Sequence, residues 1–292
     1  MHLGDVFDNR QSINLMVQHR GIAIFEELAK IFTGGVWVIA GNHDVMKKSS
    51  NEVCSLDCLK WIPNVHILKE PRVVAFGGAR CLMMPWRPGP DEERACITSF
   101  AGDADYLFCH TNVVGMKLVD HVHTVADGTA ITAEDLADFR RVLAGHIHLR
   151  QTVKGNVHML GNPYQMTRSD MGDEKGWHTL DPATDELAFH ANTTSPRFKR
   201  VYLPQWGDRP IDELVEECRG HMVDLYVPSS YFVSGYSVNA LTSELSPVSR
   251  SLEVVTYDDA DSAEPPPVDA GSQFSILDLC EKFVGGMGSL DA

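Results

Sequence analysis

Four short polar segments carry side chains that commonly bind divalent metals. They are Gly4-Asp5-Val6-Phe7-Asp8, Gly41-Asn42-His43-Asp44, the single residue His110, and Gly145-His146-Ile147-His148. A pair of metal ions about 3.5–4 Å apart needs one bridging carboxylate and further oxygen or imidazole ligands. Such a mixed ligand set favours manganese, iron or zinc over magnesium alone. The segments therefore predict a two-metal site.

Each of these segments lies near an apolar run with the character of a β-strand. Residues 36–40 form a β-branched run typical of a strand buried on both faces. Residues 105–109, 141–144 and 157–160 are similar runs that lead into polar residues. Because open α/β sheets build their sites at the carboxyl ends of strands, these polar residues are expected to meet at one edge. Apolar residues in 11–32 recur at helical spacing, which predicts one amphipathic helix or two shorter ones.

Composition and charge exclude several classes of protein. The 292 residues include 40 acidic and 25 basic side chains, a formal charge of −15, and the acidic excess lies mainly after residue 200. A protein held on DNA by a diffuse basic surface is therefore not expected. The seven cysteines include no CxxC pair, and no charged-then-apolar leader precedes them, which predicts a cytoplasmic protein without a disulfide framework. No apolar run is long enough to span a membrane.

Taken together, the four segments resemble the calcineurin-like metallophosphoesterases, whose pattern is D-x-H, G-D-x-x-D/H, G-N-H-D/E, a lone His and G-H-x-H. Four of the five occur here in order. Gly161-Asn162-Pro163-Tyr164-Gln165, with the later Lys175-Gly176-Trp177, narrows the resemblance to SbcD-like nucleases and the recombination endonuclease subunits of T-even phages. The opening D-x-H is absent, so the resemblance implies a further strand ahead of Met1 that supplies it.

The resemblance implies two divalent metal ions, with Mn²⁺ the leading choice and Mg²⁺, iron or zinc the alternatives. Asp5 would bridge the two ions. Asn42, His110 and His146 would complete the ligands of one ion, and His148 would bind the other. His110 stands alone in the sequence, so a hydrogen-bonded core histidine is the alternative for that residue.

The resemblance also implies roles for residues that do not bind the metals. His43 would act as general acid toward the leaving oxygen of a phosphodiester, and Asp44 would orient it. Asp8 and Arg10 would lie near the substrate. Asp is also a favoured residue at helix N-termini, so Asp5 or Asp8 capping the following helix is the alternative reading of the first segment.

We expect an α/β fold, the metallophosphoesterase two-sheet sandwich flanked by helices. The nuclease domain would cover residues 1–198, and a small α+β capping domain that contacts DNA would cover residues 199–257. Strand-like and helix-like patterns after residue 200 indicate the second of these domains. Residues 258–272 are acidic and proline-rich, as in linkers, and residues 273–292 are expected to form a docking helix.

The leading hypothesis is a metal-dependent DNA exonuclease or endonuclease subunit. It would work with an SMC-like coiled-coil ATPase in DNA repair or recombination, and the helix in 11–32 would form a homodimer or pack on its own sheet. One alternative is a non-catalytic subunit that couples the ATPase to DNA. The other is a small-molecule phosphodiesterase, which the segment around residues 161–177 and the extra domain disfavour.

Overall fold

The chain, seen in a computed structural model, divides into two compact units, Met1–Ser195 and a second that begins at Pro196. The predicted boundary lies between residues 198 and 199. None of the described helices combines the length and apolarity needed to cross a membrane. The predicted linker after residue 258 and the predicted terminal helix lie outside the described residues, which are 1–47, 49–100, 102–119, 122–124, 130–207, 209–233 and 238–258.

A six-stranded mixed sheet, in the order β11-β12-β10-β7-β6-β5, forms the centre of the first unit. The four inner strands run parallel, and the two edge strands run antiparallel to their neighbours. The strands are β5 (Arg72–Phe76), β6 (Ala79–Met84), β7 (Tyr106–His110), β10 (Arg141–Gly145), β11 (Gln151–Val153) and β12 (Val157–Met159).

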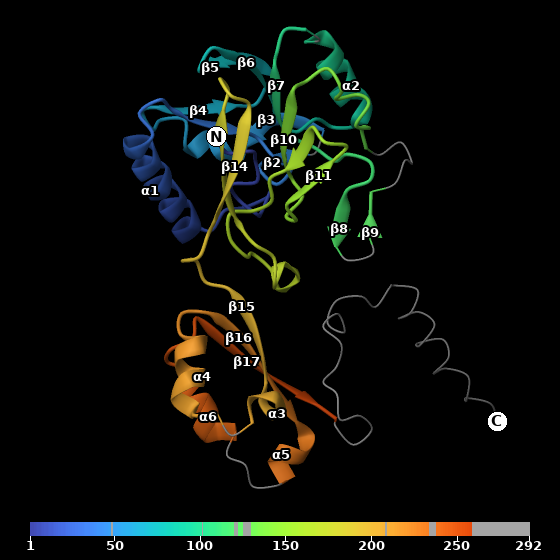
Figure 1. Cartoon of the computed structure of the whole chain (residues 1–292). Helices are drawn as coiled ribbons and strands as arrows, with labels where there is room; N and C mark the ends of the chain where they lie inside the picture. Colours follow the sequence, from blue (N-terminus) through green and yellow to red (C-terminus); the bar gives the residue numbers. More distant parts are fainter. Residues whose placement is uncertain are drawn as a thin grey trace, which may run out of the picture. The chain divides into compact units, whose positions relative to one another are not determined.

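The remaining elements of this unit surround the sheet (Figure 1). They are α1 (Leu15–Ile31), β1 (Val36–Ile39), β2 (Val45–Lys47), β3 (Ser50–Cys54), η1 (Ser55–Cys58), β4 (Val65–Leu68), α2 (Pro90–Ser99), β8 (Lys117–Val119), β9 (Val122–His123), η2 (Arg168–Asp170), β13 (Gly176–Asp181) and β14 (Glu186–Ala191).

Both faces of the central sheet are buried, which confirms the predicted two-sheet α/β architecture. Successive residues of a strand point to opposite faces. Met83 of β6 therefore shares a buried cluster with Ile39 of β1, and β1 and β4 pair in parallel as a second small sheet. The neighbouring Leu82 shares a different cluster with Ile97 of α2. The sheet is thus sandwiched between another sheet and a helical layer.

The predicted helix within residues 11–32 is a single helix, α1. Its N-cap is Asn14, whose side chain accepts a hydrogen bond from the amide of Met16, so neither Asp5 nor Asp8 caps it. Phe25 is buried against β1, but much of the apolar surface of α1 stays open. Six apolar side chains at or beside the helix are more than half exposed: Leu15, Met16, Val17, Ile24, Ile31 and Phe32.

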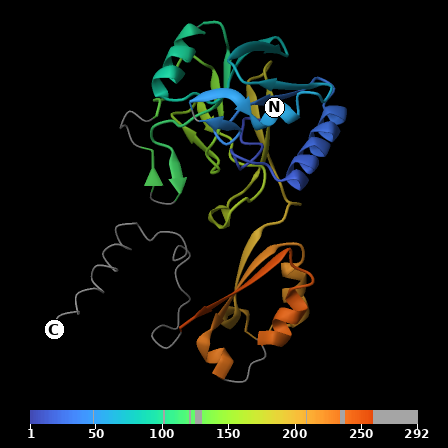
Figure 2. The ribbon, with the colours of Figure 1, turned by 180° about the vertical axis from the view of Figure 1, so that it is seen from behind.

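The second unit is a three-stranded parallel sheet with helices (Figure 2). Its first strand starts at Phe198, two residues before the strand-like pattern expected after residue 200, and Leu203 begins a short helix. The core is formed by Leu214, Leu225 and Leu241. The elements are β15 (Phe198–Tyr202), α3 (Leu203–Trp206), α4 (Ile211–Cys218), β16 (Met222–Pro228), α5 (Ser229–Val233), α6 (Val238–Leu245) and β17 (Ser251–Tyr257).

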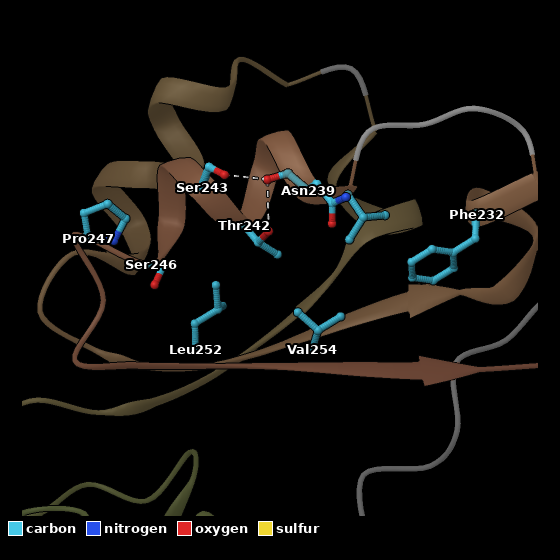
Figure 3. A pocket seen from close by; sticks show the side chains of 9 residues that line it. Phe232, Asn239, Thr242, Ser243, Ser246, Pro247, Leu252 and Val254 are labelled. Carbon is cyan, nitrogen blue, oxygen red and sulfur yellow. Dashed lines mark hydrogen bonds between the residues drawn. The ribbon is translucent and has the colours of Figure 1, made fainter.

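A hollow of about 770 Å³ lies on the second unit, where α6 faces β17. Figure 3 shows Leu252 and Val254 of β17 below Thr242 and Ser246. The full lining is Phe232, Val238, Asn239, Thr242, Ser243, Ser246, Pro247, Leu252 and Val254. This lining offers no charged group for a metal ion or a phosphate. The predicted site residues all belong to the first unit.

Candidate metal centre

Two of the predicted metal-binding segments follow neighbouring parallel strands. In the register of β7 and β10, His110 lies opposite Gly145. Because parallel strands end at the same edge of a sheet, His110 at the end of β7 lies beside His146, the residue after β10. The T-shaped contact of their rings, with centroids 4.9 Å apart, confirms this. The sheet therefore positions two imidazoles at its carboxyl edge.

The other two segments reach the same edge beside β1. His2 forms a parallel bridge to Val38 of β1, and the chain turns directly after it into Asp5. Asn42 follows three residues after the end of β1. Asp5 has a φ of 57°, in the left-handed region that aspartate tolerates better than most residues. This turn brings the Asp5 carboxylate back toward the sheet edge.

Three of the five predicted metal ligands converge on one atom of a fourth, Nε2 of His110. Asn42 Oδ1 lies 2.9 Å from it, His146 Nδ1 3.1 Å and Asp5 Oδ2 3.2 Å. Ligand atoms of Asp5, His110 and His146 all lie within 4.8 Å of one another. Across the described ranges of the chain, no other three His, Cys, Asp or Glu side chains meet this condition.

The hydrogen-bonding pattern of His110 fits a cation among these side chains. Its Nδ1 lies 2.6 Å from the carbonyl oxygen of Leu3, and a carbonyl can only accept, so Nδ1 carries a proton. In a neutral His110 the Nε2 lone pair then faces the amide oxygen of Asn42 and the carboxylate of Asp5, which are acceptors as well. Converging lone pairs repel unless a proton or a metal ion lies between them. The donor set therefore fits a divalent metal.

Asp44 clamps the two loops that carry Asp5 and Asn42. Its buried carboxylate accepts hydrogen bonds from the amides of Asp5 at 2.7 Å, Gly41 at 2.9 Å and Val6 at 3.0 Å. Burial raises the pKa of Asp44 to about 6; the Gly41 amide lowers it, and the Asp5 charge raises it further. A Cβ at position 41 would collide with the Asp5 carboxylate, so only glycine allows this approach.

The structure gives His43 a different partner from the one predicted. Asp44 was expected to orient this imidazole, but its carboxylate is engaged by backbone amides. Nδ1 of His43 instead lies 2.7 Å from the carbonyl oxygen of Asp8 and 3.5 Å from the Asp8 carboxylate. The His43 side chain is 40% exposed. Its Nε2 edge can therefore meet a substrate beside the metal ligands.

The other two predicted substrate residues differ in exposure. The Asp8 side chain is 91% exposed, which suits a contact with a bound molecule but not a metal ligand. The Nε atom of Arg10 is buried and has no hydrogen-bond partner. A role of either side chain toward substrate stays a prediction.

His148, the fifth predicted ligand, lies outside the four-residue cluster. Its side chain is 48% exposed, and its Nδ1 lies 4.0 Å from the Asp170 carboxylate. Its positive form would lower the pKa of His146, so the two imidazoles are within electrostatic reach. The predicted ligands of one ion thus lie together, whereas His148, predicted to bind the other ion, lies apart from them.

The charge states of the clustered side chains suit metal binding. Burial, then the neighbouring His110, lowers the pKa of His146 to about 3, so its imidazole is neutral at pH 7. Burial disfavours ionisation of Asp5, but the His110 side chain and the His43 amide outweigh it and lower the pKa to about 2. The ring of Trp86, 5.7 Å from that of His146, covers one side of the cluster. Neutral imidazole and charged carboxylate are the forms that bind metals.

A buried acid that the sequence does not reveal lies behind the cluster. Glu93 of α2 is 5% exposed and accepts a hydrogen bond of 2.8 Å from the hydroxyl of Thr111, the residue after His110. In the sequence, Glu93 is one of three acids in the first turn of a helix, where acids are favoured at the surface. No pattern distinguishes it from its exposed neighbours.

Glu93 is expected to make the protein less stable as the pH rises. Burial raises its pKa from 4.5 to about 7, so the folded state holds the proton more tightly than the unfolded state. The stability contributed by this group is full at pH values below 4.5 and is lost as the pH rises through about 7. Glu93→Gln keeps an acceptor for Thr111 and should remove up to about 3 kcal/mol of this pH dependence.

Denaturant unfolding of the metal-free protein between about pH 5 and pH 8 measures this effect. Glu92→Gln, on the same turn but exposed, is the matched control and should leave the pH dependence as in the wild type. An unchanged pH dependence in Glu93→Gln would show that Glu93 is not the group responsible.

Fold and site together define an α/β protein with a candidate metal centre at the carboxyl edge of its main sheet. The chain is 25% identical over 207 residues to Exonuclease subunit 1 of Enterobacteria phage T4. The match covers 69% of this chain and 58% of the phage protein. No family model matches the chain. The chain is thus distantly similar to a phage exonuclease subunit and spans less than two thirds of the length of that protein.

Proposed function

We propose that this chain is a DNA nuclease subunit that uses divalent metal ions, Mn²⁺ in the first place. The observation that carries the proposal is the convergence of Asp5, Asn42 and His146 on Nε2 of His110. The distant similarity to a phage exonuclease subunit supports the reaction class. Asp5 would be shared between two ions, and His148 would contribute to the ion that the cluster does not hold.

Different side chains would have different roles in phosphodiester cleavage. When bound, divalent ions would activate water and stabilise charge on the phosphate oxygens. His43 donates the Nδ1 proton to the Asp8 carbonyl oxygen, which fixes the plane of its ring and leaves Nε2 for the substrate. In its protonated form, His43 can then give the Nε2 proton to the leaving 3′ oxygen of DNA. Asp44 keeps the loops of Asp5 and His43 together.

Cleavage of labelled DNA tests the proposed function. The chain should degrade a duplex or single-stranded oligonucleotide with Mn²⁺ and leave it intact with a chelator. A small aryl phosphodiester, offered in parallel, should react more slowly than DNA. Reaction of only the small compound would favour the phosphodiesterase alternative. Metal binding without cleavage of either substrate would favour the non-catalytic coupling subunit, for which the isolated position of His148 is the supporting observation.

A homodimer fits the surface of α1. The exposed side chains of Leu15, Ile24 and Ile31 leave apolar surface open on a helix for which the sequence allowed either a contact between subunits or packing on its own sheet. Burial of such surface between two copies would stabilise their association. Sedimentation velocity of the wild type and of Ile24→Glu tests this; a monomeric wild type would contradict it.

We expect residues 273–292 to bind the coiled coil of an SMC-like ATPase partner. The segment between Phe274 and Val284 has apolar residues at helical spacing after an acidic linker, and such tethered helices commonly dock into grooves. Deleting residues 258–292 should leave metal binding unchanged and weaken capture of the ATPase. Phe283→Asp should weaken it too, whereas Ser275→Asp, a change at a polar position, should not. Unchanged capture by the deletion variant would contradict this assignment.

A further inference from the structure

A buried ion pair lies next to His148. The side chains of Lys175 and Asp170 are 4% and 3% exposed, and Lys175 Nζ lies 2.7 Å from Asp170 Oδ1. Burying two charges costs free energy unless each is fully hydrogen-bonded. Lys175 meets this condition, because Nζ also donates to Asp173 Oδ2 at 3.1 Å and to the backbone carbonyl oxygen of His148 at 2.9 Å. Lys175 thus donates one of its three hydrogen bonds to the backbone of a predicted metal ligand.

The other oxygen of Asp170 fixes the loop that follows the GHIH segment. Oδ2 accepts hydrogen bonds from the amides of Met166 at 2.9 Å and Thr167 at 3.0 Å, and from Asn162 Nδ2 at 3.3 Å. The backbone amide of Asn162 donates a hydrogen bond of 3.3 Å to the His148 carbonyl oxygen, which also accepts from Lys175. The pair therefore ties the loop and the backbone of His148 into one rigid group.

Asp170 is also the carboxylate nearest to the His148 ring in the described contacts. Its Oδ1 lies 4.0 Å from Nδ1 of His148. Histidines that bind metals usually direct their second ring nitrogen to a carboxylate or carbonyl, which selects the tautomer and orients the ring. Lys175 carries one positive charge against the two carboxylates of Asp170 and Asp173, and the Asp170 carboxylate is the one that faces Nδ1 of His148. A proton on Nδ1 is favoured, which leaves the Nε2 lone pair for a metal.

We propose that Lys175 and Asp170 are positioning residues that hold the backbone of His148 and set its tautomer for binding a divalent metal through Nε2. This proposal rests on the proposed function. Buried ion pairs are often replaced by well-packed apolar side chains with little loss of stability, so stability alone does not explain a buried pair. The contact to the His148 backbone and the carboxylate facing its ring give the charges a specific purpose.

The test follows the imidazole nitrogens of the full chain by ¹⁵N NMR during titration with Zn²⁺, a diamagnetic probe. The His148 signal is assigned by its absence in His148→Gln. In the wild type, the metal-free His148 should carry its proton on Nδ1. In Lys175→Met and in Asp170→Asn, this preference should be lost, and His148 should need about 10–100-fold more Zn²⁺ for the same response. His110 and His146 should respond at the wild-type Zn²⁺ concentration.

Lys69→Met is the matched control. Lys69 also joins a carboxylate, Asp57, to a backbone carbonyl oxygen, that of Glu52, but these partners are not predicted site residues. This variant should leave the His148 tautomer and Zn²⁺ response unchanged. Circular dichroism establishes the temperature at which all variants are folded; Asp170→Asn, which keeps the side-chain shape, serves if Lys175→Met does not fold.

The outcomes separate the two proposals. A wild-type tautomer and wild-type Zn²⁺ response of His148 in both variants would overturn the positioning role. An equal loss of response at His110, His146 and His148 would overturn it as well, since the effect would then be general disorder of the site. If no histidine of the wild type responds to Zn²⁺, the metal-dependent function fails. The tautomer of His148 in the variants still decides the positioning role.

Discussion

Replacing His146 with alanine is expected to remove tight Mn²⁺ binding and, with it, DNA cleavage. His146 Nδ1 lies 3.1 Å from the His110 nitrogen on which the predicted ligands converge, and burial keeps it neutral. Loss of a direct ligand should weaken Mn²⁺ binding by more than the roughly 10–100-fold cost of losing a hydrogen-bond partner of a ligand. Calorimetric titration with Mn²⁺ should show about one tight equivalent in the wild type and none in the variant.

His158→Ala is the matched control for this experiment. His158 belongs to the neighbouring strand β12 and is half buried, but it contacts Arg141 and Thr152 instead of the cluster. This change should leave Mn²⁺ binding and cleavage near wild-type values. Equal losses in both variants would show that damage to the sheet, and not loss of a ligand, explains the effect.

Replacing His43 with alanine should reduce the cleavage rate by about 10²–10⁴, the usual contribution of a positioned general acid. Mn²⁺ binding should persist, because His43 is not among the side chains that converge on His110. Its side chain contacts Asp8 through the backbone carbonyl, at 2.7 Å. The measurements are single-turnover cleavage and Mn²⁺ titration on the same protein.

Asp8→Ala separates the two contacts that His43 makes. The substitution keeps the carbonyl oxygen at 2.7 Å and removes the carboxylate at 3.5 Å. We expect a much smaller loss of rate than in His43→Ala, since the backbone contact orients the ring. If His43→Ala lost metal along with activity, His43 would be a ligand and the general-acid assignment would be wrong.

The central sheet is largely predictable from the sequence, because its strands are apolar runs that end in polar residues. The strand predicted over 105–109 is β7, which ends one residue later at His110. The convergence of His110 with His146 also follows from the rule that parallel strands end at one edge. The sequence cannot show that Asp5 adopts a positive φ. It also cannot show that the Asp44 carboxylate accepts hydrogen bonds from the amides of both the Asp5 loop and the Asn42 loop.

The parts that could not be predicted are contacts to the backbone and charges that are buried. The partner of His43 is a carbonyl oxygen, which every residue has, so no residue type signals it. Glu93 and Lys175 have the charges of surface residues and are buried only because Thr111 and Asp170 meet them in the fold. The resemblance singled out Lys175 by its motif but gave it no physical role.

Exposed apolar surface is a further limit of the sequence pattern. Helical spacing correctly predicted α1, but an apolar side chain such as Ile24 reads the same whether it packs within the chain or against another one. The structure leaves Ile24 58% exposed. The spacing therefore predicts the helix but does not show which surface its apolar side chains contact.

The most direct test of the metal centre is anomalous diffraction from crystals of the chain soaked in Mn²⁺. We expect a strong manganese peak in contact with Asp5 Oδ2, Asn42 Oδ1, His110 Nε2 and His146. These side chains should move apart from their metal-free positions to make room for the ion. A second, weaker peak between Asp5 and His148 would agree with a two-metal site. Absence of a peak among the four side chains at saturating Mn²⁺, or a peak held by other residues, would contradict a metal centre formed by these four residues.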